Sequence, residues 1–124
     1  MEILTSSPEL DEGLIKPENW ANEDWIHGQL KWLRENDPLR LTEPDGFDPF
    51  WNVTKYHDIK EVEQNKRVFI NDPRPVLGSK MVNAVAQQLS GRKHLVRSLV
   101  QIEDPDHMKY RRLTQGWFMG TNLR

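Results

Sequence analysis

Residues 103–118 read EDPDHMKYRRLTQGWF, and this stretch predicts a helix whose beginning is marked in the sequence. Asp104 can act as the N-cap, because its carboxylate can accept a hydrogen bond from a free backbone N–H. Pro105 then takes the first helical position, where an N–H is not needed. Asp106 lies in the first turn, where a negative charge interacts favourably with the helix dipole. We therefore expect a helix over residues 104–119.

At about 100° per residue, this helix has three faces. The first face carries His107, Arg111, Thr114 and Phe118. The second is an apolar stripe of Tyr110, Leu113 and Trp117. The third carries Lys109, Arg112 and Gly116. Because His107 and Arg111 are four residues apart, we expect both to direct donors at one point on the buried side. An arginine fork and an imidazole suit an anion with several oxygens, such as a carboxylate. The alternative is a capped amphipathic helix in which both side chains pair with nearby acids.

The first half of the chain predicts an arm, a helix and a hairpin. Residues 1–21 are polar and are broken by prolines and a glycine, which favours an irregular N-terminal arm. Asn22 can cap a helix over residues 23–35, where apolar side chains recur at helical spacing. Residues 39–42 are a short strand candidate, and residues 50–56 are rich in aromatic and β-branched side chains. The turn signal Glu-Pro-Asp-Gly between them predicts a β-hairpin.

Two shorter helices are expected between the hairpin and the marked helix. Asp58 can cap a helix that ends near residue 65. Residues 79–90 form another amphipathic segment, and Gly91 follows it as a stop signal. Its apolar stripe consists of Met81, Val82, Val85, Ala86 and Leu89.

In their order and spacing, these motifs resemble the first part of the bacterial cytochrome P450 family, the haem-thiolate monooxygenases. DPDH at 104–107, followed by RRL at 111–113, is similar to the family's C-helix, and FWNVTKYHDI at 50–59 is similar to the segment that enters its helix B. The resemblance covers residues 23–124 and implies a mainly α fold with a small β-hairpin (α+β). It implies one partial domain. The parts of that domain are an N-terminal arm (1–21), helix A, the hairpin and helix B (22–70), a B–C loop with a short helix (71–103) and the C-helix (104–119).

The resemblance also assigns roles to residues. His107 and Arg111 would bind the propionates of a haem cofactor, and Lys109 and Arg112 would face a ferredoxin- or flavodoxin-like redox partner. The loop between helices B and C covers the substrate in this family. The residues of this loop that would do so here are Val82, Val85, Ala86 and Leu89. Residues 79–90 could instead be a surface helix that packs its stripe onto the body.

The composition excludes several kinds of site. The chain has no cysteine, so it has no disulfide, no cysteine nucleophile, no thiolate metal site and no axial thiolate for a haem iron. The four histidines lack ligand spacing, so no metal site is expected within the chain. No apolar run approaches the roughly 20 residues that cross a bilayer, and the N-terminus lacks the pattern of a signal peptide. We therefore expect a cytoplasmic protein with no membrane contact.

The resemblance implies a monooxygenase that oxidises an apolar small molecule with dioxygen. Because the family's axial cysteine lies far beyond the C-helix, we expect this chain to be an N-terminal fragment, inactive alone and without catalytic residues. A second possibility is a small non-catalytic binding or regulatory module built from the same first elements. A third is a nucleic-acid binder, because residues 80–124 hold 8 basic and 3 acidic residues. No nucleic-acid motif accompanies this charge, so no nucleic-acid partner is expected.

Overall fold

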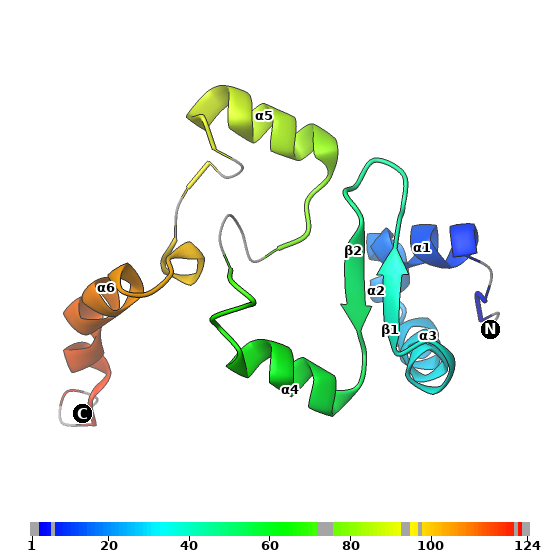
Figure 1. Ribbon diagram of the computed structural model, residues 1–124, viewed down its shortest axis with the longest axis horizontal. Helices are drawn as coiled ribbons and strands as arrows, with labels where there is room; N and C mark the ends of the chain where they lie inside the picture. Colours follow the sequence, from blue (N-terminus) through cyan, green and yellow to red (C-terminus); the bar gives the residue numbers. More distant parts are fainter. Residues whose placement is uncertain are drawn as a thin grey trace. The chain divides into compact units, whose positions relative to one another are not determined.

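The computed structural model describes residues 3–5, 7–71, 76–92, 95–96, 98–120 and 122 of the 124-residue chain. The chain divides into two compact units, Met1–Lys66 and Arg67–Arg124, each of which is described by itself. Within the described residues, helices and a two-stranded sheet make up the regular structure, which confirms the expected mainly α fold with a small hairpin (Figure 1).

The first unit contains four helices and the hairpin among its described residues. Their bounds are α1 (Ser7–Ile15), α2 (Pro17–Trp20), α3 (Glu23–Asn36), β1 (Leu39–Thr42), β2 (Phe50–Val53) and α4 (Tyr56–Gln64). The predicted start of α3 is confirmed, because the Asn22 side chain accepts a hydrogen bond from the backbone N–H of Trp25 at 3.1 Å. Such a bond satisfies one of the free donors at the helix N-terminus.

The hairpin is confirmed with a shorter second strand than predicted. β1 and β2 are antiparallel, with Leu39 opposite Val53 and Thr42 opposite Phe50. Gly46 has a φ of +75°, which a glycine adopts without steric cost, and it allows the chain to turn. The second strand ends at Val53, and just beyond it both the backbone N–H and the hydroxyl of Thr54 donate to the carbonyl oxygen of Pro38.

Two expectations for the first unit are wrong. Residues 1–21 are not irregular, since α1 and α2 lie within them. The reason is that Leu10 and Leu14, four residues apart, are buried against Leu33 of α3, which stabilises a helix too short to persist alone. Asp58 is not a cap, because α4 begins two residues earlier and Asp58 lies within its first turn.

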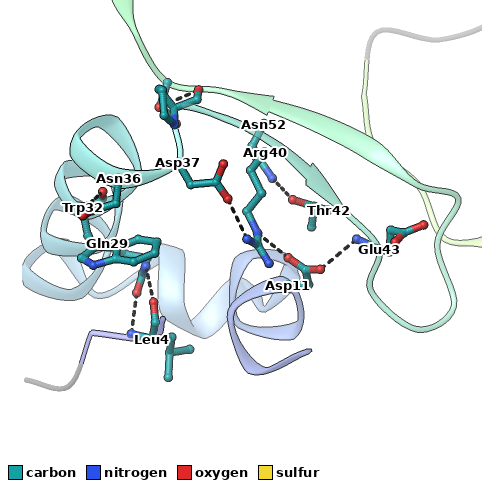
Figure 2. A network of polar contacts seen from close by, with 12 residues as sticks. Leu4, Asp11, Gln29, Trp32, Asn36, Asp37, Arg40, Thr42, Glu43 and Asn52 are labelled. Carbon is teal, nitrogen blue, oxygen red and sulfur yellow. Dashed lines mark hydrogen bonds and ion pairs between the residues drawn. The ribbon is translucent and has the colours of Figure 1, made fainter. Parts of the chain in front are cut away.

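A polar network joins the N-terminal helices to the hairpin (Figure 2). The buried Arg40 of β1 donates to Asp11 of α1 and to Asp37, each at 2.8 Å. The second carboxylate oxygen of Asp11 accepts from the backbone N–H of Glu43 at 3.1 Å. Burial by itself lowers the pKa of Arg40. The hydrogen bonds to the two aspartates and their negative charges raise this pKa by more than burial lowers it, so the net shift is upward.

The second unit contains α5 (Lys80–Ser90) and α6 (Asp106–Gln115), together with the short helices η1 (Leu99–Gln101) and η2 (Gly116–Phe118). The predicted limits of α5 are confirmed. The Ser79 hydroxyl accepts from the backbone N–H of Val82 at 3.2 Å, and Gly91 ends the helix in the left-handed conformation with a φ of +70°. Residues 72–75 of the expected B–C loop lie outside the described residues, as do parts of 93–97 and of 121–124.

Candidate functional site

The candidate site lies on α6, whose beginning differs from the prediction. The helix starts at Asp106, and Pro105 at the N-cap position offers no side-chain hydrogen bond. The assignment of Asp104 as the N-cap is therefore wrong. Its carboxylate lies instead 4.0 Å from Nδ1 of His107, one turn further along the chain. The backbone N–H of His107 donates to the carbonyl oxygen of Glu103 at 3.0 Å, so a turn already precedes the helix.

His107 and Arg111 lie one turn apart on α6, but the face that carries them is open. The side chain of His107 is 29% exposed, and Arg111 is exposed. Among the described residues, no hydrogen bond or ion pair involves the Arg111 guanidinium. The expected burial of this side is not found in the described chain, because α6 contains no buried residue. The open arginine is available to an anion from outside.

The other face of α6 carries two cationic side chains, which differ in whether an acidic residue pairs with them. The Lys109 ammonium lies 2.7 Å from the carboxylate of Asp106, and this hydrogen bond, followed by the charge of Asp106, raises the pKa of Lys109. Arg112 is exposed, and the part of the chain that the structure describes offers its side chain no ion-pair partner. Of the two residues predicted to face a redox partner, Arg112 thus has the less compensated charge.

The apolar stripe of α5 is mostly exposed. Ala86 is 4% exposed, whereas Val82, Val85 and Leu89 are open to solvent. One residue of α5 was not singled out from the sequence. The side-chain oxygen of Asn83 is buried and has no hydrogen-bond partner in the described chain. The sequence signal for Asn83 was a polar residue inside an apolar segment. Such a residue is notable because buried polar atoms are normally paired.

Other parts of the described chain offer weaker candidates for a functional site. An open hollow of about 400 Å³ lies along α4 and is lined by His57, Lys60, Glu61, Gln64 and Asn65. Within the described residues, no group of three or more histidines, cysteines, aspartates or glutamates could hold a metal ion. Over the same residues, we find no helix with the length and apolarity that a membrane span requires. The donors of α6 therefore remain the best-defined candidate site.

Two proteins are similar to this chain over nearly all of its length. Cytochrome P450-terp of a Pseudomonas species is 30% identical over 127 aligned positions, which cover 100% of this chain and 30% of that protein. The crystal structure of CYP108D1 from Novosphingobium aromaticivorans matches with a TM-score of 0.85 and 30% identity, over 98% of this chain and 30% of that one. No family model matches the chain.

The two comparisons agree with the resemblance that the motifs predicted. The chain spans about 30% of the length of either relative. In sequence and in fold, the chain therefore matches the N-terminal part of bacterial cytochromes P450.

Proposed function

We propose that the chain supplies the haem-propionate site of a P450 monooxygenase that oxidises an apolar small molecule with dioxygen. The observation that carries this proposal is the open guanidinium of Arg111, one helical turn from the imidazole of His107. A propionate carboxylate that enters a mostly apolar site needs charge-assisted donors. Arg111 meets this need without displacing an acidic residue of the described chain, so the donors fit the group.

Arg111 would form the main ion pair with a propionate, and His107 would add a second donor. The carboxylate of Asp104 lies 4.0 Å from Nδ1 of His107, one turn before it. Bound haem would supply the oxygen chemistry, and the protein would supply position and electrostatics. Because these 124 residues include no cysteine, a thiolate for the iron would have to come from other residues. We infer that the chain alone does not catalyse the reaction.

The remaining predicted roles are proposed with one refinement. The exposed Val82, Val85 and Leu89 of α5 would contact an apolar substrate, and the buried Ala86 would hold the helix in place. Arg112 would attract an acidic ferredoxin- or flavodoxin-like partner more strongly than the paired Lys109. The cytoplasmic location stays a prediction from the sequence.

The first test is to read the gene beyond the codon for residue 124. A segment resembling Phe-x-x-Gly-x-His-x-Cys-x-Gly would support the monooxygenase. A complete reading frame without a cysteine would contradict it and would favour the non-catalytic binding module.

Where the gene encodes such a segment, the second test measures haem content in the protein that contains it. Arg111→Ala should lower haem affinity by about tenfold or more, because a charge-assisted hydrogen bond is lost. Arg112→Ala is the matched control, since it removes the same side chain from the next position of α6. This control should keep its haem but accept electrons from an acidic partner more slowly, with a defect that shrinks at high salt. Loss of haem from the control and not from Arg111→Ala would refute the assignment.

A further inference from the structure

Glu103 lies between η1 and α6 and accepts two hydrogen bonds from different parts of the chain. Its side-chain Oε1 accepts from the backbone N–H of Asn71 at 2.6 Å, across 32 positions of sequence. Its carbonyl oxygen accepts from the backbone N–H of His107 at 3.0 Å. All three residues belong to the second unit. One half-buried residue therefore joins a distant backbone amide to the first turn of α6, where the imidazole lies.

The start of α6 has no side-chain cap. The first N–H groups of a helix have no partner within it, and Pro105 at the N-cap position offers them no side-chain hydrogen bond. The helix has 10 residues, and isolated helices shorter than roughly 12–15 residues are marginal in water. The Glu103 carbonyl satisfies the N–H of His107, but it fixes His107 only as well as Glu103 itself is fixed. The bond from Asn71 is therefore the contact that can hold this turn in place.

The ion pairs near the start of α6 are local. Lys109 pairs with Asp106 at 2.7 Å, and the carboxylate of Asp104 lies 4.0 Å from Nδ1 of His107. Each joins residues three positions apart, and pairs on an exposed surface contribute little to stability. The bond from Asn71 reaches much further along the chain. Its acceptor is a carboxylate, which binds an N–H about twice as strongly as a neutral oxygen does.

We propose that Glu103 is a positioning residue for the haem-propionate site. Its bond to Asn71 holds the start of α6, so that the imidazole of His107 keeps its place one turn from Arg111. Asn71 and Glu103 are also the first and last residues of the predicted B–C loop, which carries α5. The propionate donor and both ends of that loop thus share one anchor. The inference rests on the proposed function only for the role of His107.

Nuclear magnetic resonance on the 124-residue chain tests the link without haem. Asn71→Pro removes the donor N–H and leaves the sequence of α6 unchanged. We expect it to shift the ring resonances of His107 and to speed exchange of the His107 backbone amide by about tenfold, while the rings of His27 and His57 in the first unit do not shift. Asn71→Ala is the matched control, since it keeps the N–H, and it should leave His107 as it is. An unchanged His107 in Asn71→Pro would overturn the proposal.

Variants at the other end of the bond separate the link from a proline effect and from a charge effect. Glu103→Ala should change His107 as Asn71→Pro does, and Glu103→Gln, which keeps an acceptor oxygen, should restore most of the original spectrum. Because both changes break one bond, Asn71→Pro combined with Glu103→Ala should move His107 no further than either alone. Additive shifts in the double variant would overturn the link. So would a shift in Glu103→Gln as large as that in Glu103→Ala, because the charge of Glu103 would then be the cause.

Where the gene encodes an axial cysteine, the haem content of that protein separates this inference from the proposed function. Asn71→Pro should weaken haem binding by less than Arg111→Ala does, because the arginine stays in place. Haem that is kept in Arg111→Ala, while Asn71→Pro still displaces His107, would support the link and contradict the propionate site. Haem that is lost in Arg111→Ala, with His107 unchanged in Asn71→Pro, would support the propionate site and overturn the link.

Discussion

Replacing Arg40 with alanine should destabilise the first unit more than any other change to a surface or network residue. The guanidinium is the shared partner of Asp11 and Asp37, and the side chains of Arg40 and Asp11 are each 10% exposed. Removal of one member of a buried ion pair costs about 3–5 kcal/mol, because it leaves an uncompensated charge. We expect about 3 kcal/mol here, since Asp11 keeps its bond from Glu43 and Asp37 is 37% exposed.

The assay is urea unfolding followed by the fluorescence of the five tryptophans, among which Trp32 lies beside the leucine core. A double-mutant cycle isolates the ion pair from the loss of packing. Arg40→Met combined with Asp11→Leu should be much less destabilising than the sum of the two single changes, because no buried charge is left unpaired. A loss below about 0.5 kcal/mol for Arg40→Ala would refute the reasoning. It would mean that the network does not hold α1 to the hairpin.

Three smaller predictions concern the same unit. Gln29→Leu should cost about 2 kcal/mol in urea unfolding, because the buried amide bonds both the N–H and the carbonyl of Leu4 at 2.9 Å. Gly46→Ala should cost about 1 kcal/mol at its φ of +75°, and Gly46→Asn should cost less in the same assay. Because the pKa of Arg40 is raised, its contribution is present below the ordinary arginine pKa and is lost only as pH rises through the higher folded value. The unfolding free energy that Arg40 supplies should thus show no loss between pH 7 and 10, measured against Arg40→Met.

Several elements could be predicted because their signals lie within a few residues. Asn22 and Ser79 bond the backbone N–H three residues ahead, and Gly91 ends its helix through its own backbone freedom. The hairpin turn has the same local origin. The order and spacing of several motifs, among them those at 50–59 and 104–113, predicted the family resemblance, because the order of residue types along the chain can be read without knowledge of their contacts.

Only the tertiary structure decided what lies in the interior. α1 is stable because Leu10 and Leu14 pack on Leu33, and its Asp11 meets Arg40 far away in the sequence, so no local signal marked residues 1–21 as helical. The amphipathic pattern of α5 and α6 correctly indicated helices, but it could not show whether their apolar faces are covered. Periodicity sets which side chains share a face, whereas burial of that face depends on contacts with other segments of polypeptide.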